Sequence, residues 1–94
     1  MKHGLFCDVV GVTARNKALE CFLEMDSLDF GLGDIAHDSN LSRAETYIIC
    51  KQLLKEKLIV KTRKVGRTQL YQLADNLRTN VLLRLFKDIL MNWK

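Results

Sequence analysis

One change of periodicity, close to residue 58, limits what this chain can fold into more than any other feature. Before it, apolar or small residues recur with the i, i+3, i+4, i+7 spacing of a helix that buries one side: Thr46, Ile49, Cys50 and Leu53. After it, the segments LIVKTR and TQLYQL alternate as strands do, and the KVGR between them supplies the turn residue Gly66. The sequence therefore predicts a helix followed directly by a two-stranded hairpin.

The start of this helix has a local signature. Ser42 and Glu45 have the spacing of a capping box, in which each side chain accepts from a backbone amide of the first turn. We expect the helix to run to about Lys57. A tight connection over residues 39–42 joins it to a short preceding helix, which we expect over residues 33–38.

Two further helices are predicted at the ends of the chain. Thr13 can cap a helix over residues 14–26, in which Ala14, Ala18, Cys21, Phe22 and Met25 form one face. Asp75 or Asn76 can cap a last helix that ends near residue 92. A short extra strand near Phe30 completes the expected elements.

Length and composition favour one folded domain, residues 1–94. A chain of 94 residues with 48% apolar residues can build a modest core, with little room for an enclosed active site. No apolar run approaches the roughly 18 residues of a membrane span. The start of the chain, interrupted by Asp8, does not resemble a signal peptide. We expect a soluble, cytoplasmic protein with no membrane partner.

Charge is segregated along the chain. Residues 43–67 hold eight basic side chains against two acidic ones, a local excess of +6, although the whole chain has a net charge of only +4. Residues 18–38 hold six acidic side chains and no Lys or Arg. A polyanion would therefore meet this molecule on one side only. Charges that merely solvate a surface would not require this segregation by segment.

The ordered segments resemble a known family. Residues 34–73, DIAHDSNLSRAETYIICKQLLKEKLIVKTRKVGRTQLYQL, are similar to the winged helix-turn-helix regulators of bacteria and archaea, and ARNKALECFLEM resembles their first helix. The ending LADNLRTNVLLRLFKDIL resembles the leucine-rich last helix of ArsR-like members. Lys57 departs from the pattern, because the family usually has a helix-ending glycine there. We expect Lys57 either to adopt a left-handed conformation or to mark a different helix end.

The resemblance implies a fold and a function. The fold is α+β and mostly helical: three helices and a two-stranded β wing over residues 13–73, then a C-terminal dimerisation helix over residues 76–92. The function is sequence-specific binding of double-stranded DNA by a homodimeric transcriptional regulator, with residues 43–56 as the recognition helix in the major groove and residues 61–70 as the wing on the backbone or minor groove. The alternative is a winged helix used for protein interaction, or for non-specific nucleic-acid binding, in a larger assembly.

The recognition helix would offer the face opposite its core positions to DNA. The candidate residues on that face are Ser42, Arg43, Ala44, Tyr47, Ile48, Lys51 and Lys55. Arg43 could contact a guanine or a phosphate, while Ala44 and Ile48 could pack on thymine methyl groups. The lysines suit phosphates better than base edges. As alternatives, Ile48 could be buried against the fold and Tyr47 could be a half-buried packing residue.

The wing would present positive charge around a tight turn. Its candidate residues are Lys61, Arg63, Lys64, Gly66 and Arg67. Gly66 permits the turn, the cations can reach phosphates, and Tyr71 and Leu73 would hold the root of the ribbon against the core. The alternative is an exposed hairpin whose charges only discourage edge-to-edge pairing.

The last helix predicts a partner subunit. Its apolar side chains cover about 160° of the helix circumference, whereas a helix lying on a small domain needs only about 100°. We expect a homodimer whose interface includes Leu82, Leu85, Phe86, Ile89, Leu90 and Trp93, with Leu19 and Leu23 from the first helix beside them. A monomer that buries this helix in its own core is the alternative.

Catalysis, metals and cofactors are not indicated. His3 and His37 lack neighbours of a catalytic set, so we expect no enzymatic activity and no cofactor. The three cysteines have no CxxC spacing, and we expect no metal site and no disulfide framework. Cys21 and Cys50 fit core positions, whereas Cys7, near the terminus, is expected to be exposed and could cross-link two chains on oxidation.

Overall fold

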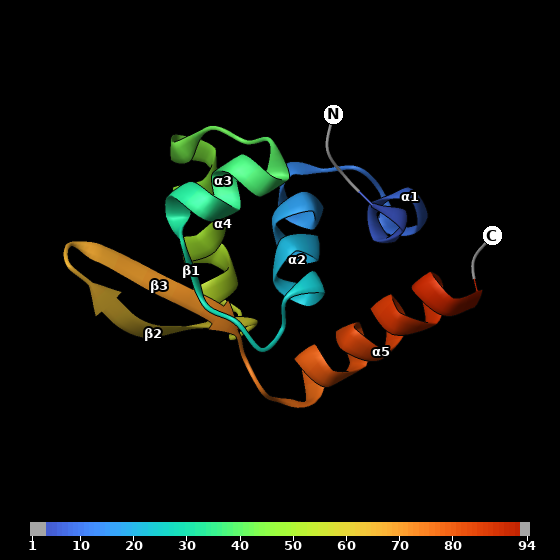
Figure 1. The fold of residues 1–94 in the computed structure, drawn as a ribbon. Coiled ribbons are helices and arrows are strands. Elements are labelled where there is room, and N and C mark those ends of the chain that lie inside the picture. The colour runs from blue at the N-terminus through green and yellow to red at the C-terminus, as the bar shows by residue number, and fades with distance from the viewer. Residues whose placement is uncertain (1–3, 93–94) are drawn as a thin grey trace.

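The computed structural model describes residues 4–92, and its elements follow the predicted order with one helix added at the start (Figure 1). They are α1 (Leu5–Val10), α2 (Ala14–Glu24), β1 (Phe30–Gly31), α3 (Leu32–Ser39), α4 (Arg43–Lys55), β2 (Ile59–Val65), β3 (Thr68–Leu73) and α5 (Leu77–Asn92). The short strand expected near Phe30 is β1. No helix within residues 4–92 is long and apolar enough to cross a membrane.

The ends of α4 have the predicted chemistry. The backbone amide of Glu45 donates to Ser42 Oγ at 3.1 Å, and the amide of Ser42 donates to Glu45 Oε1 at 3.3 Å, which confirms the capping box. At the other end Lys57 has a φ of 62°, the left-handed conformation that glycine adopts without strain. Of the two expected alternatives, Lys57 therefore takes the left-handed conformation.

The other helix ends also follow local rules. The amide of Asn16 donates to Thr13 Oγ1 at 3.0 Å, so Thr13 caps α2 as predicted. Asn40 ends α3 in the left-handed region at φ 55°, which allows the tight connection to α4. At α5, the amide of Thr79 donates to Asn76 Oδ1 at 3.1 Å, so Asn76 rather than Asp75 is the capping residue.

The three strands form an antiparallel sheet in the order β1-β3-β2. Phe30 pairs with Tyr71 on one side of β3, and Lys61 pairs with the same residue on the other side. β2 lies at one edge of the sheet and continues with β3 as a hairpin that projects beyond the helices (Figure 1). The root of the hairpin is buried at Ile59, Tyr71 and Leu73, as predicted for the last two.

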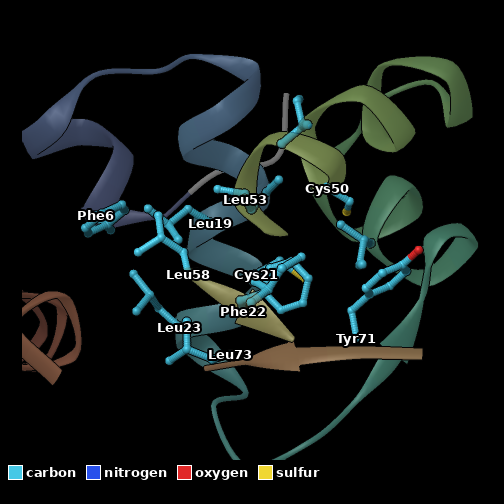
Figure 2. Packing of buried hydrophobic residues seen from close by; sticks show 14 of the residues in the cluster. Phe6, Leu19, Cys21, Phe22, Leu23, Cys50, Leu53, Leu58, Tyr71 and Leu73 are labelled. Atoms are coloured by element: carbon cyan, nitrogen blue, oxygen red, sulfur yellow. The ribbon is translucent and has the colours of Figure 1, made fainter. Parts of the chain in front are cut away.

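The core lies where α2, α4 and the root of the hairpin meet. Figure 2 shows side chains from these elements converging in one cluster, among them Phe22, Leu53 and Leu73. The rings of Phe22 and Phe30 lie 5.4 Å apart between centroids, which fixes the loop before β1 onto α2. Cys50 also lies in this cluster, as predicted.

The helix α1 was not predicted, and it changes the environment of Cys7. Gly4 precedes this six-residue helix, and the amide of Gly4 donates to Glu20 Oε1 of α2 at 2.7 Å. The ring of Phe6 packs edge-on against Phe86 of α5 at 6.1 Å, so α1 covers the core between α2 and α5. Cys7 belongs to α1 and its side chain is fully buried, so the expectation of an exposed Cys7 is wrong.

Candidate nucleic-acid interface

The outward face of α4 carries every residue predicted for the recognition helix. The core takes Thr46, Ile49, Cys50 and Leu53, so the opposite face is left to solvent. The exposed residues include all seven candidates: Ser42, Arg43, Ala44, Tyr47, Ile48, Lys51 and Lys55. Ile48 is 57% exposed and Tyr47 is 51% exposed. More than half of the Ile48 surface is open to solvent, so the alternative of a buried Ile48 is wrong.

Tyr47 and Lys51 form a pair one helical turn apart. The Nζ atom of Lys51 lies 5.4 Å from the centroid of the Tyr47 ring, within the range of a cation–π interaction. The pair restrains two side chains that would otherwise lose more rotamer freedom on binding a ligand. It also places a hydroxyl group and an ammonium group next to each other on the exposed face of α4.

Arg43 lies against the first turn of α3. A Cβ atom at Gly33 would lie 2.6 Å from Arg43 Nη2, so the guanidinium group covers this glycine. The sequence places Gly33 at the start of the expected helix over residues 33–38, but it gives no signal of this contact with Arg43. The side chain of Arg43 is exposed at the start of α4, where a ligand of this face could reach it.

The wing has a tight turn and exposed cations. Gly66 has a φ of 63°, and no atom lies within 4 Å of the position of a Cβ, so the need for glycine here is conformational and not steric. Lys61, Lys64 and Arg67 are exposed, as predicted. The pKa of Tyr71 at the root is raised, first by burial and then by Cys50 and Tyr47, so the root of the wing lies close to α4.

A bulge in β2 decides which way the wing cations point. Lys61 pairs with Tyr71 and Lys64 pairs with Gln69, so two residues, Thr62 and Arg63, lie opposite Leu70 alone. Directly opposed residues of an antiparallel pair point to the same face of the sheet, as do alternate residues along one strand. Lys61 and Lys64 therefore share the face of Tyr71, which is the face covered by the helices.

Arg63 has a partner within the chain. Its Nε and Nη2 atoms donate to the two carboxylate oxygens of Asp29 at 3.0 and 3.3 Å. The hydrogen bonds from Arg63 and Thr62 lower the pKa of Asp29, and Asp29 raises the pKa of Arg63. The guanidinium group that was predicted to reach phosphates is therefore held in a bidentate pair within its own chain.

The three thiols are buried and protonated at neutral pH. Burial raises the pKa of Cys7 and of Cys21 to about 12 and that of Cys50 to about 11. Metal binding and fast oxidation both require the thiolate, which these surroundings disfavour. Within residues 4–92, no group of three His, Cys, Asp or Glu side chains has the arrangement of a metal site.

The acidic segment surrounds a hollow on the α2–α3 side. Asp29, Asp34, Asp38 and His37 line this hollow of about 310 Å³ together with Cys21, Met25 and Phe30. One carboxylate oxygen of Asp34, Oδ2, accepts a hydrogen bond from the amide of Gly31 at the start of α3, at 3.3 Å. The charge segregation of the sequence is retained in part, since Asp34 and Asp38 lie on α3 and the exposed basic residues of the 43–67 segment lie on α4 and the wing, but Asp29 of this hollow is paired with Arg63 of the wing.

Half of the residues predicted for the dimer interface are buried within their own chain. Leu19, Leu23, Phe86 and Ile89 are at most 6% exposed, because α1, α2 and α5 pack on one another. The interface prediction is wrong for these four residues. Leu82 is half-buried, Leu85 and Leu90 are exposed, and Trp93 lies outside the described residues.

A different apolar stripe remains uncovered on α5. Leu77, Val81 and Leu85 follow each other every four residues and are 79%, 59% and 41% exposed. Ile89 continues this row by four more residues, but there the row turns inward, and Ile89 and Phe86 are buried toward α1 and the core. Sequence reasoning missed Leu77 and Val81, although their spacing with Leu85 is the signal that could have found them.

The two candidate surfaces approach each other at one end, because Leu77 of the α5 stripe lines a hollow together with Lys55 and Lys57 at the end of α4. Figure 1 shows α3, α4 and the hairpin on one side, α2 in the middle, and α1 with α5 on the other side. α4 and the hairpin are therefore neighbours in the fold, while most of α5 extends away from them toward α1.

Comparisons with known proteins identify the fold. No protein-family sequence model matches the chain, and no match is found among curated proteins. The transcriptional regulator HlyU from Vibrio vulnificus is similar in structure, with a TM-score of 0.65 and 16% identity, covering 78% of this chain and 74% of HlyU. The adhesin competence repressor AdcR from Streptococcus pyogenes has a TM-score of 0.63 and 18% identity, and the match covers 82% of this chain and 60% of AdcR.

BpsR from Bordetella bronchiseptica is a third match, with a TM-score of 0.63, 18% identity, and coverage of 92% of this chain and 63% of BpsR. The chain thus spans less than two thirds of the length of AdcR and of BpsR. Identities this low show the fold, which agrees with the observed helices, β-hairpin and last helix. The chain has the mostly helical α+β fold of winged helix-turn-helix transcriptional regulators, as its sequence predicts.

Proposed function

We propose that this protein is a homodimeric transcriptional regulator that binds double-stranded DNA with sequence preference. The observation that carries the proposal is that α4 and the wing, both exposed and both basic, are neighbours in the fold, with α1 and most of α5 on the other side of the molecule (Figure 1). Two structural matches, HlyU and AdcR, are a transcriptional regulator and a repressor, and BpsR is a protein whose DNA binding is regulated by 6-hydroxynicotinic acid.

The face of α4 suits the major groove. A helix with its side chains is about 10–12 Å wide and the groove is about 12 Å wide, so one exposed helix fits. The first half of the face is mostly uncharged, with Ala44, Tyr47 and Ile48, and the second half carries Lys51 and Lys55. The first half would contact base edges and thymine methyl groups, while the lysines would contact phosphates.

Arg43 would act at the start of this helix. Its guanidinium group rests on Gly33 of α3 and is exposed, so it can turn to a guanine edge in a bidentate contact. Ser42 precedes it and has its hydroxyl group occupied by the amide of Glu45, so Ser42 would contact DNA only through its remaining hydrogen-bonding capacity.

The wing would bind the backbone beside the groove. Lys61 and Lys64 share the helix-side face of the hairpin, and Arg67 follows the turn at Gly66. Each cation that meets a phosphate releases condensed counterions, so the wing would contribute affinity that falls with salt and does not depend on sequence.

The exposed stripe of α5 would form the dimer. Leu77, Val81 and Leu85 offer a row of apolar side chains along α5, which starts beside the end of α4 and runs toward α1 (Figure 1). Val9 and Val10 of α1, each 40% exposed, extend the apolar surface next to α5. A two-fold arrangement through this surface would leave two recognition helices free for two half-sites about one helical turn apart.

Selection of bound duplexes from a random DNA pool at physiological salt tests the proposal. We expect enrichment of a palindrome whose half-sites are centred about 10–10.5 base pairs apart. Lys51→Ala with Lys55→Ala serves as the control, because it should weaken binding without changing the selected sequence. Binding without enrichment would contradict sequence preference. Failure to bind any duplex would reject the DNA-binding function and favour a protein-interaction module.

A further inference from the structure

The distal half of the wing lacks the apolar contacts that hold its root. Every residue from Val60 to Thr68 is exposed, whereas Ile59, Tyr71 and Leu73 are buried. A two-stranded hairpin is marginally stable by itself in water. Some other contact must therefore set the direction in which Lys64, Gly66 and Arg67 project.

The carboxylate of Asp29 makes that contact. Its Oδ2 atom accepts from Thr62 Oγ1 at 2.6 Å and from Arg63 Nε at 3.0 Å, and its Oδ1 atom accepts from Arg63 Nη2 at 3.3 Å. A bidentate guanidinium–carboxylate pair fixes orientation as well as distance. The Asp29 side chain is 16% exposed and Arg63 is 66% exposed, so the carboxylate belongs to the body of the domain and the guanidinium group to the projecting ribbon.

The bulge makes this arrangement possible. In a regular strand Thr62 and Arg63 would point to opposite faces, but here both lie opposite Leu70 and both reach the same carboxylate. Gln69 Nε2 holds the bulge from the other strand, since it donates to the carbonyl oxygens of Arg63 at 3.1 Å and Leu70 at 3.0 Å. Asp29 immediately precedes β1, which is paired to β3, so the contact ties all three strands together.

We infer that Asp29 is a positioning residue for the wing, and that Arg63 is its partner in the hairpin rather than a phosphate ligand. The significance of the wing's direction for DNA rests on the proposed function. Asp29 holds the bulge, and the bulge sets the side of the hairpin on which Lys61 and Lys64 meet a duplex. Asp29 thus orients the basic surface of the wing through Arg63, and Asp29 itself does not contact the DNA.

Hydrogen exchange of the free protein tests the inference without DNA. In Asp29→Ala, amide exchange over residues 62–69 should rise several-fold, while exchange in α2 and α4 stays at the wild-type rate. Asp26→Ala is the matched control, because it removes the same charge from the same loop and leaves the Asp29 contacts intact. Unchanged exchange over residues 62–69 in Asp29→Ala would overturn the inference.

A spectroscopic measurement separates positioning from a general loss of stability. The Nε–H resonance of Arg63 should be slow to exchange with water in the wild type and fast in Asp29→Ala. The reversed pair, Asp29→Arg with Arg63→Asp, should restore slower exchange over residues 62–69 than either single variant shows. If the reversed pair behaves like the worse single variant, the ion pair is not the source of the order.

DNA binding then distinguishes the two roles of Arg63. Relative to Asp26→Ala, Asp29→Ala should weaken binding by about the same factor as Arg63→Ala, and the double variant should be no weaker than either. The salt dependence of Arg63→Ala should equal that of the wild type, because no phosphate contact is lost. A slope flattened by about 1.8, the value for two lost contacts in a dimer, would instead make Arg63 a phosphate ligand and overturn the inference.

The two proposals can fail separately. If the wild type binds no duplex while Asp29→Ala still raises exchange in the wing, the proposed function is wrong and the positioning by Asp29 stands. If the wild type binds DNA and its wing exchange does not depend on Asp29, the positioning inference is wrong and the function stands.

Discussion

Removal of the two cations at the tip of the wing gives the most quantitative test of the DNA-facing surface. Lys64 and Arg67 flank the turn at Gly66, are exposed, and have no salt-bridge partner among residues 4–92. Lys64→Ala with Arg67→Ala should therefore remove phosphate contacts without disturbing the core or the Asp29–Arg63 pair.

The magnitude follows from counterion release. Five exposed cations per subunit face the proposed ligand: Lys51, Lys55, Lys61, Lys64 and Arg67. If each meets one phosphate, a dimer makes about ten contacts and log K falls against log salt with a slope of about −9. The double variant removes four contacts, so the slope should flatten by about 3.6. At 0.15 M salt this corresponds to a loss of roughly 10³-fold in affinity, about 4 kcal/mol.

Fluorescence anisotropy with a labelled duplex, measured from about 0.05 to 0.3 M salt, gives the slope. The swap of the two side chains, Lys64→Arg with Arg67→Lys, keeps both positive charges, so this matched control should keep the wild-type slope. Lys87→Ala, on the exposed side of α5, should also keep it. A slope that stays within about one unit of the wild type in the alanine double variant would refute phosphate binding by the tip of the wing.

Other consequences concern the groove, the dimer, a helix end and the thiols. Tyr47→Ala should reduce discrimination between the selected sequence and random DNA more than it reduces affinity for random DNA, and Tyr47→Phe shows whether the hydroxyl group matters; equal losses on both DNAs would reject base contact by Tyr47. Val81→Asp should give monomers in sedimentation while Lys87→Asp stays dimeric, and a dimer in both would exclude the α5 stripe as the interface. Lys57→Gly should raise the free energy of unfolding by about 0.5–1 kcal/mol in urea, because glycine adopts φ 62° without strain, whereas Lys57→Ala should not. The pKa values of Cys7, Cys21 and Cys50 are raised to about 12, 12 and 11, so the free energy of unfolding should fall as pH rises above about 9, where unfolded thiols ionise and the folded ones stay protonated. Cys50→Ala should make that fall less steep, and an identical pH profile in this variant would contradict the buried state of the Cys50 thiol.

The elements of the interface could be predicted because their signals are local. Ser42 and Glu45 mark the start of α4 within four residues, and the spacing of its apolar side chains leaves one face for solvent. Gly66 between two alternating segments marks the turn of the wing. These signals are the preferences of single residues for particular backbone geometries and the periodicity of apolar side chains. Both can be recognised in one sequence.

The dimer surface could not be predicted in the same way. An apolar arc of α5 shows that the helix is covered, but its periodicity does not say whether the cover is α1 or a second subunit. Because α1 is six residues long and contains Asp8, it produces no periodic signal, and its absence from the prediction left Leu19 and Leu23 without a partner in the chain. Those two residues were then assigned to the wrong interface.

Arg63 shows the other limit. Its ion pair with Asp29 joins residues that are 34 positions apart, and nothing local distinguishes it from the other wing cations. The bulge that brings Thr62 to the same carboxylate has no sequence signal either, since LIVKTR reads as a regular strand. Side-chain roles that depend on tertiary contacts therefore could not be predicted from the sequence.

Chemical-shift mapping during titration with a short duplex carrying one selected half-site tests the central claim most directly. Perturbed amides should cluster on the outer face of α4, at Ala44, Tyr47, Ile48 and Lys51, and along the tip of the wing, while α1 and α5 stay unperturbed. Shifts that cluster instead around the acidic hollow of α2 and α3, or along α5, would contradict the assignment of this surface to DNA.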